Sequence, residues 1–165
     1  MTKPKSAGSR NEQRSAARLA AVQALYQMDV GNATLEAVIA EFVTHRMGDE
    51  TLAEGTPADA DETYFAEIMR GVVRRQRDID PLIDQQLAEG WRLVRVDSIL
   101  RAILRAATFE LFERSEVPAR VVINEYIEVA RAFFEGDEPR VVNGVLDKIA
   151  RRLRAGELER KSAGG

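Results

Sequence analysis

Residues 120–148 have the sequence RVVINEYIEVARAFFEGDEPRVVNGVLDK, and this stretch decides the fold. Its apolar residues recur at spacings of three and four in two adjacent rows, which is typical of a helix buried on most of its circumference. The same periodicity resumes after the acidic turn EGDEP, so we predict two helices joined by a tight turn. The rows are Val122, Tyr126, Val129 and Phe133 beside Ile123, Ile127, Ala130 and Phe134 in the first helix, then Val141, Val142, Val145, Leu146, Ile149 and Leu153 in the second.

The dipeptide Asn143-Gly144 lies inside the second predicted helix, although elsewhere it would indicate a hairpin turn. The flanking residues do not alternate between apolar and polar, and a helix is therefore favoured. A glycine in a helix interior costs about 1 kcal/mol relative to alanine. We interpret Gly144 as a position where another backbone lies close.

Helical periodicity continues through the rest of the chain, and no stretch sustains the two-residue period of a strand. We predict an all-α fold of about seven helices in two small subdomains. The division that we expect is a disordered basic tail at 1–9, an N-terminal subdomain at 10–90, a C-terminal subdomain at 91–155 and a disordered tail at 156–165.

Local signals predict several helix boundaries. Thr34 and Asp97 are expected N-caps, and Asp80-Pro81 is expected to open a short helix because proline is accepted in a first turn. Ser115–Pro118 should separate two helices. The single tryptophan, Trp91, is expected to be buried between the two halves.

The composition excludes several classes of protein. The 165 residues include no cysteine, which removes disulfides, thiolate zinc sites and thiol nucleophiles. No apolar run approaches the ~18 residues that span a bilayer, and the start MTKPKSAGSR lacks the apolar centre of a signal peptide. We expect a cytoplasmic protein without a membrane segment.

Positive charge is concentrated near the N-terminus, although the net charge of the chain is only −3. Arg10, Arg14 and Arg18 are spaced four apart and share one face of the first predicted helix; we call them the arginine row. Like charges at this spacing repel, so folding alone does not favour the row. Two interpretations stay open, a solvated helix face and a contact with a polyanion.

Weaker candidates for the same contact are Lys3 and Lys5 in the tail, and Arg70, Arg74 and Arg77, which share a face at the end of a predicted helix. The helix dipole favours cations at that end, and this explains part of the group. Arginine contacts phosphate in a bidentate manner and stacks on bases. The row and the basic tail would therefore suit single-stranded RNA.

Few residues indicate catalysis. The sequence has no glycine-rich phosphate loop, no His/Cys cluster and no nucleophile–base pair in a recognisable setting. Glu125, Glu128 and Asp137 are carboxylates of the type used in acid–base work, but surface acids on an arginine-rich helical domain are usually solvated or ion-paired. We predict a binding protein that is not an enzyme and uses neither metal nor cofactor.

The pairing INEYIEVAR … VVNGVLDKI resembles the signature INEAIELAK … FVNGVLDK of the NusB family of transcription antitermination factors. Two further blocks, AAVQALYQMD and LRAILRAATFELFERSEVP, agree with the family in order and spacing, and the resemblance covers Arg10 to Arg154. It implies an all-helical protein of two small bundles. It also implies binding to boxA RNA of ribosomal-RNA leader transcripts together with ribosomal protein NusE, within an antitermination assembly on the RNA polymerase elongation complex.

The resemblance further implies site residues. The family's arginine-rich N-terminus falls on the arginine row, and its acidic turn residue, where RNA affinity is adjusted, falls on Asp137. Val141 replaces an aromatic residue that can stack on a base, so stacking is expected from other residues such as Arg140. The glutamate that some members use against NusE aligns with Leu100, and the residues that contact NusE therefore stay undetermined.

An alternative is a stand-alone helical RNA-binding or dimerisation module related to the N-terminal domain of ribosomal-RNA cytosine methyltransferases. That enzyme would need a C-terminal nucleotide-binding domain, which these 165 residues do not include. Some family members pair with themselves and hide the RNA face, so a homodimer is a further alternative.

Overall fold

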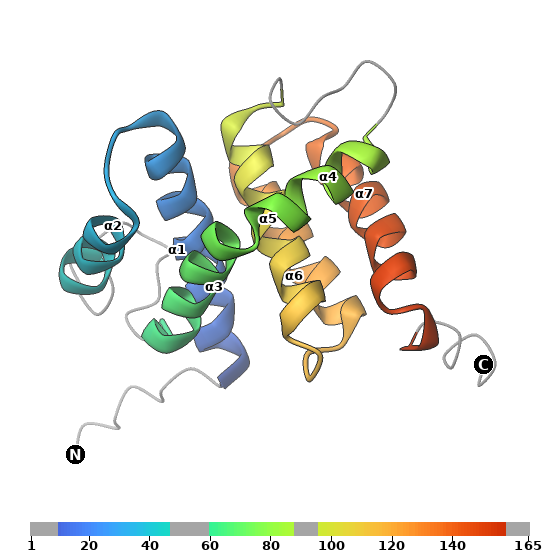
Figure 1. Cartoon of the computed structure of the whole chain (residues 1–165), viewed down its shortest axis with the longest axis horizontal. Coiled ribbons are helices and arrows are strands. Elements are labelled where there is room, and N and C mark those ends of the chain that lie inside the picture. Colours follow the sequence, from blue (N-terminus) through green and yellow to red (C-terminus); the bar gives the residue numbers. More distant parts are fainter. Residues whose placement is uncertain (1–9, 47–59, 88–95, 158–165) are drawn as a thin grey trace. The chain divides into compact units, whose positions relative to one another are not determined.

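A computed structural model describes residues 10–46, 60–87 and 96–157. Within these ranges every regular element is a helix and no strand occurs, which confirms the predicted all-α fold (Figure 1). The chain divides into two compact units, residues 1–73 and 74–165. The elements are α1 (Arg10–Val30), α2 (Leu35–Glu41), the π-helical turn η1 (Phe42–Arg46), α3 (Glu62–Arg74), α4 (Gln76–Gln86), α5 (Ser98–Glu113), α6 (Ala119–Phe133) and α7 (Glu138–Leu153).

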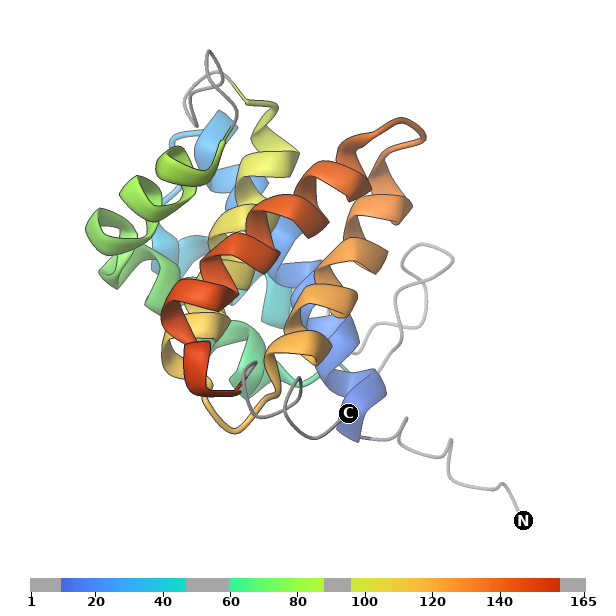
Figure 2. The same ribbon diagram turned by 90° about the vertical axis from the view of Figure 1, so that its right-hand side faces the viewer.

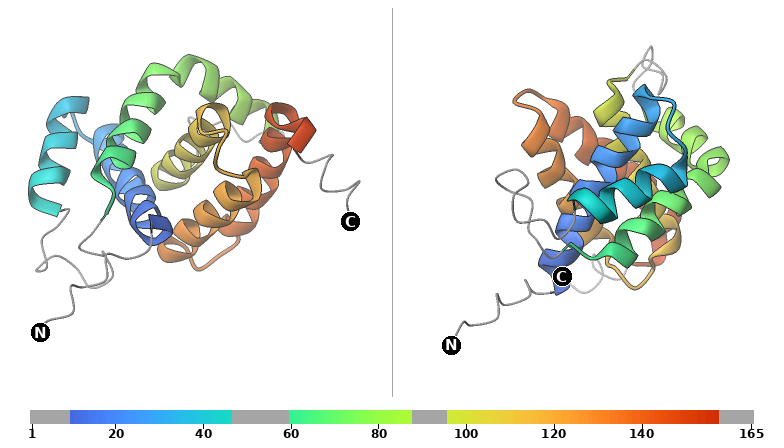
Figure 3. Two further views of the ribbon diagram at one scale, coloured as in Figure 1. Left: turned by 90° about the horizontal axis from the view of Figure 1, so that it is seen from below. Right: turned by 90° about the vertical axis from the view of Figure 1, so that its left-hand side faces the viewer.

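In the first unit, α1 packs through small residues. Ala17, Ala21 and Ala24 are fully buried, so a neighbouring helix can approach the α1 backbone closely. The right panel of Figure 3 shows α2 lying across α1, and the ring of Phe42 in η1 stacks on Phe65 of α3 with the centroids 5.7 Å apart. These contacts join all four elements of the unit.

The N-cap of α2 is Thr34, as predicted. Its hydroxyl oxygen accepts a hydrogen bond from the Ala37 backbone N–H at 3.3 Å. Such a bond satisfies one of the N–H groups that a helix leaves unpaired in its first turn. Asp97 caps α5 in the same way, with its carboxylate accepting from the N–H groups of Ile99 and Leu100.

An ion pair joins α2 to α3 on the surface of the first unit. Arg70 donates from Nε and from Nη2 to the two carboxylate oxygens of Glu36, each at 3.0 Å. These hydrogen bonds lower the pKa of Glu36 below its ordinary value of 4.5. The carboxylate is therefore charged over a wider pH range in the folded chain than in the unfolded chain.

The Glu36→Gln variant should lose a pH-dependent part of the stability. Because folding lowers the pKa of Glu36, the contribution of the pair is fully present above pH 4.5 and is lost as the pH falls through the folded-state pKa. The effect is small, since both side chains are exposed. Urea unfolding of both proteins at several pH values should show their free energies of unfolding converging below pH 4.5. A difference that is independent of pH would contradict the prediction.

In the second unit, α5, α6 and α7 pack against one another, and α4 packs on α5 and α7. Figure 2 shows α6 and α7 side by side and antiparallel, joined by the tight turn that the sequence predicts. The core includes Tyr126, whose O–H donates to the Glu110 carboxylate at 2.5 Å, with both side chains fully buried. The hydrogen bond offsets the cost of burying these two polar groups.

Helix α4 differs from its prediction. It begins at Gln76, and Pro81 lies inside it instead of at its start. Pro81 has no N–H to donate to the preceding turn. The helix is held instead by the buried Ile79 and Ile83 and by a bidentate pair in which Arg105 of α5 donates to Asp80 at 2.9 and 2.8 Å.

These contacts place α4 with the second unit, and the division falls between residues 73 and 74. The predicted boundary at residues 90 and 91 lies outside the described residues, as do Trp91 and the tail at 1–9. Glu157, near the start of the predicted C-terminal tail, is held in place: its carboxylate accepts from the Ala119 N–H at 2.7 Å and from Arg154 at 3.2 Å.

The interpretation of Gly144 is wrong. A Cβ atom built on this glycine would meet nothing within 4 Å, and both Asn143 and Gly144 are exposed. No neighbouring backbone therefore requires the glycine. Because Gly144 has no side chain, the backbone of α7 is left uncovered next to Asn143.

No helix in the described part of the chain has the length and apolar character needed to cross a membrane.

Candidate nucleic-acid interface

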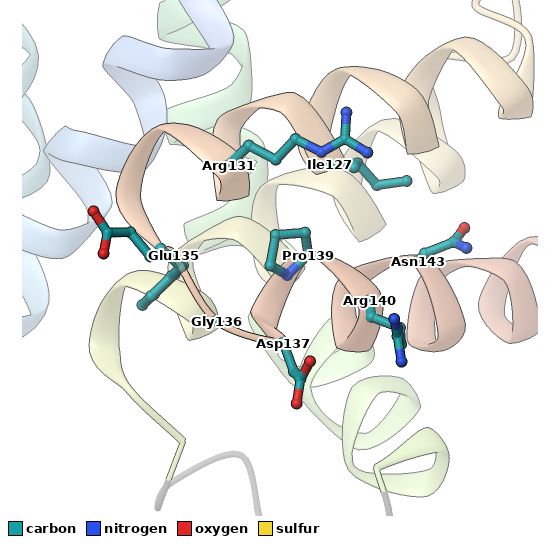
Figure 4. A pocket seen from close by; sticks show the side chains of 9 residues that line it. Ile127, Arg131, Glu135, Gly136, Asp137, Pro139, Arg140 and Asn143 are labelled. Atoms are coloured by element: carbon teal, nitrogen blue, oxygen red, sulfur yellow. The ribbon is translucent and has the colours of Figure 1, made fainter.

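An open groove of about 680 Å³ lies at the turn between α6 and α7. It is formed by the stretch from which the fold was predicted, and Figure 4 shows it with its side chains. Both helices and the turn contribute to the lining, which consists of Ile127, Arg131, Phe134, Glu135, Gly136, Asp137, Pro139, Arg140 and Asn143.

The sequence of the turn determines which groups face the groove. Phe134 leaves the helical conformation and ends α6, and Pro139 stands in the first turn of α7, where its missing N–H would be unpaired in any case. Asp137 is the N-cap residue of α7 but makes no side-chain cap hydrogen bond. Its exposed carboxylate is therefore left facing solvent at the edge of the groove.

The groove carries mixed charge. Two arginines, Arg131 of α6 and Arg140 of α7, oppose two acids of the turn, Glu135 and Asp137. In Figure 4, Pro139 lies between the two arginines, and the Glu135 carboxylate points away from them. An anion in the groove would be attracted by the guanidinium groups and repelled by the turn.

Arg131 already has an anionic partner. Its Nη1 donates to the Glu128 carboxylate one turn earlier on α6 at 2.5 Å, with 63% of the arginine side chain and 65% of the glutamate side chain exposed. Exposed pairs of this kind contribute only a few tenths of a kcal/mol, about 0.3–0.5. A phosphate group can therefore replace Glu128 at little cost.

These side chains suit a single nucleic-acid strand. The guanidinium forks can hold phosphate, the Asn143 amide can both donate to and accept from a base edge, and Phe134 and Pro139 supply apolar surface. Arg140, predicted as a stacking residue, is exposed and lines the groove. Val141 is half-buried and does not line it, because it lies one position round α7 from Arg140.

The arginine row does not stay on one exposed face. Arg10 is exposed, Arg14 is half-buried, and Arg18 is only 2% exposed. The reason is helical geometry: four residues turn a helix by about 400°, so Arg18 is rotated by about 80° from Arg10 around the axis. That rotation carries the row from solvent into contact with α3. The expectation of a shared solvent-facing row is therefore wrong for Arg18.

The two inner arginines meet a tyrosine of α3. The guanidinium carbon of Arg14 lies 4.6 Å from the centroid of the Tyr64 ring, and that of Arg18 lies 5.2 Å from it. Arg18 also donates from Nη2 to the Tyr64 hydroxyl oxygen at 3.1 Å. We call Arg14, Arg18 and Tyr64 the arginine–tyrosine cluster.

The weaker candidates that the structure describes do not gather on one face. Lys3 and Lys5 lie outside the described residues. Arg70 is paired with Glu36, and Arg74 with Glu113. Arg77 is exposed but lies on α4, since the helix is interrupted at Arg75, and the predicted face of three arginines does not form.

Three residues of these two sites escaped the sequence analysis. Arg131 and Tyr64 were not predicted as site residues, and Asn143 was considered only as part of a turn-like dipeptide. The signal for Arg131 and Asn143 was their closeness to the turn between the two helices. Tyr64 carried no local signal, because its partners lie about 50 residues earlier in the chain.

Residues 10–46, 60–87 and 96–157 contain no group of three or more His, Cys, Asp or Glu side chains that could hold a metal ion.

Fold and sites together describe an all-helical protein with arginines gathered at an open groove and beside a tyrosine, and comparisons with known proteins identify the family. Residues 15–151 match the NusB family. The transcription antitermination protein NusB of Allorhizobium ampelinum is 58% identical over 142 residues, which cover 86% of this chain and 88% of the relative. The protein of the same name from Agrobacterium fabrum is 55% identical over 148 residues, covering 90% and 88%.

Solved structures of NusB proteins are also similar to this chain in fold. NusB from T. maritima matches with a TM-score of 0.73 at 31% identity, over 88% of this chain and 96% of that chain. A chain in the crystal structure of the antitermination factors NusB and NusE in complex with double-stranded RNA matches with a TM-score of 0.68 at 25% identity, over 85% and 97%. The chain described here belongs to the NusB family.

Proposed function

We propose that the protein is a transcription antitermination factor that binds boxA-type RNA of ribosomal-RNA leader transcripts together with the ribosomal protein NusE. The pair would join the antitermination complex on RNA polymerase, in the cytoplasm, and the protein would act by binding and not as an enzyme. Family membership and the solved NusB–NusE–RNA complex support this proposal. The observation that carries it is the groove, which brings Arg131, Arg140 and Asn143 together at the family's signature sequence.

The proposed binding has a physical basis in two places. In the second unit, the groove offers two guanidinium groups and an amide beside apolar surface. In the first unit, α1 offers the exposed Arg10 and the half-buried Arg14. Phosphate contacts of this kind supply affinity that falls as salt rises, whereas the groove is where bases would be distinguished.

Titration of labelled boxA RNA with the protein, in the presence and absence of NusE, tests the proposal. We expect binding in both titrations and a higher affinity when NusE is present, because the two proteins would share one RNA ligand. RNA of the same composition in scrambled order is the control, and it should bind more weakly. Equal affinity for the two RNAs and indifference to NusE would refute the proposed function.

Neutralising Arg10 and Arg14 together, as Arg10→Gln with Arg14→Gln, should weaken RNA binding and flatten its salt dependence. Each phosphate contact with a single strand contributes about 0.7 to the slope of log affinity against log salt, so two lost contacts should reduce the slope by about 1.4. Arg18 is left unchanged because it is buried.

Fluorescence anisotropy at several salt concentrations measures this slope. Arg120→Gln is a matched control, since it removes an exposed arginine that lies in neither candidate site. A slope that stays at the wild-type value in the double variant would show that α1 makes no phosphate contact.

A further inference from the structure

The arginine–tyrosine cluster is held by the start of α3. Asp61 caps this helix, with its carboxylate accepting from the Tyr64 backbone N–H at 2.9 Å. The backbone N–H of Asp61 in turn donates to the Gln13 carbonyl oxygen of α1 at 3.0 Å. One residue thus fixes both the helix that carries Tyr64 and its attachment to α1, next to Arg14. The position of the ring relative to Arg14 is therefore set by backbone contacts as well as by packing.

Arg14 is an unusual arginine in this surrounding. Its Nε–H is buried and has no hydrogen-bond acceptor, and no carboxylate pairs with it among the described residues. Arg70 and Arg105, which also meet a neighbouring helix, have acidic partners in Glu36 and Asp80. A buried donor without a partner destabilises the folded chain, and the contact with the ring face offsets only part of that cost.

Two positive charges lie close together here. The guanidinium carbons of Arg14 and Arg18 lie 4.6 and 5.2 Å from the centroid of the Tyr64 ring, and like charges four residues apart on a helix repel. An anion at the exposed side of Arg14 would relieve the repulsion and would pair with the uncompensated guanidinium.

From these contacts we propose that Tyr64 is a positioning residue of the RNA-binding surface: its ring holds the Arg14 guanidinium in place to meet a phosphate of the bound strand, and Arg18 fixes the ring through the hydroxyl group. This inference rests on the proposed RNA binding and names the contact that α1 makes. Tyr64 itself is buried and does not touch the RNA. It acts through Arg14.

A double-mutant cycle between Arg14 and Tyr64 tests this inference, with labelled boxA RNA as the probe. Tyr64→Leu removes the ring and should weaken binding about fivefold, the equivalent of about 1 kcal/mol for a cation–π contact. Arg14→Gln should weaken binding by at least as much. Because Tyr64 acts only through Arg14, the double variant should bind no more weakly than Arg14→Gln alone.

The slope of log affinity against log salt distinguishes a positioning role of Tyr64 from a purely structural one. Both Tyr64→Leu and Arg14→Gln should lower the slope by about 0.7, the value for one phosphate contact. A purely structural role of Tyr64 would leave the slope unchanged. Tyr64→Phe keeps the ring and should stay within about twofold of the wild-type affinity.

Nuclear magnetic resonance of the wild-type protein gives a measurement that does not depend on how the variants fold. The Arg14 Nε–H resonance should be shifted by the tyrosine ring in the free protein and should move again when RNA is added. Affinity losses that multiply in the double variant, or an Arg14 resonance that RNA leaves unchanged, would overturn the role of Tyr64. Failure of the wild-type protein to prefer boxA over scrambled RNA would instead overturn the proposed function and this inference with it.

Discussion

Replacing Arg154 with methionine is expected to lower the free energy of unfolding by on the order of 4 kcal/mol, about 1 kcal/mol for each of four carbonyl groups that would lose a donor. Arg154 follows α7 and is only 8% exposed. Its Nε donates to the Leu111 carbonyl at 3.0 Å, its Nη2 to those of Glu110 and Arg114 at 3.0 and 2.9 Å, and its Nη1 to that of Val117.

The loss of stability should be large because of where these four carbonyl groups lie. They belong to the end of α5 and to the turn that leads into α6, where a helix leaves its last carbonyl groups without partners. One planar guanidinium supplies donors in several directions at once, so Arg154 joins the end of α5 to the end of α7. A methionine fills a similar volume but supplies no donor. The Glu110 and Arg114 carbonyls keep the backbone N–H groups of Arg114 and Val117 as partners, whereas the carbonyls of Leu111 and Val117 lose the guanidinium donor.

Urea unfolding followed by circular dichroism measures the loss. Arg151→Met is the matched control, since Arg151 is 71% exposed and pairs with Asp147 one turn away. That exposed pair should contribute less than about 0.5 kcal/mol. Arg154→Lys should not rescue the stability, because one ammonium group cannot reach four carbonyls in a fixed fork. A loss of under about 1 kcal/mol in Arg154→Met would show that water replaces the guanidinium.

The helices of this protein were predictable because their signals are local. The apolar rows of α6 and α7, the acidic turn between them, and the caps Thr34 and Asp97 each depend on residues within a few positions of one another. The start of α4 was not predictable in this way. Pro81 indicated a helix start, and the contacts that override this signal come from Arg105, 25 residues further along the chain.

The candidate sites were predictable only in part, for the same reason. Asp137 and Arg140 lie between the two blocks of the signature sequence, and both line the groove. The contact partners of Arg18 and Arg70 could not be predicted, since Tyr64 lies 46 residues from Arg18 and Glu36 lies 34 residues from Arg70. Spacing along one helix indicates which residues share a face. Which neighbour that face meets depends on how the helices pack, and a single sequence does not contain this information in local form.

Reversing the charge of the groove arginines, as Arg131→Glu with Arg140→Glu, should weaken boxA RNA binding by about 100-fold. Two charge-assisted contacts of about 1.5 kcal/mol each would be lost, and each factor of ten in affinity corresponds to 1.4 kcal/mol. Both side chains are exposed, so the fold should not change. Equal unfolding curves for the variant and the wild-type protein would establish that the loss is one of binding.

Removing acidic groups from the same place should act in the opposite direction. Asp137→Asn takes one negative charge from the edge of the groove, and Glu128→Gln releases Arg131 from its ion pair, so each should raise RNA affinity by a few fold. Asp147→Asn is the matched control, because that acid lies on α7 outside the groove and should leave RNA binding unchanged. The two gains should shrink at high salt, as screening weakens both the repulsion and the attraction. Losses in place of gains, or a gain as large in Asp147→Asn, would show that the phosphate of the RNA lies elsewhere than between Arg131 and Arg140.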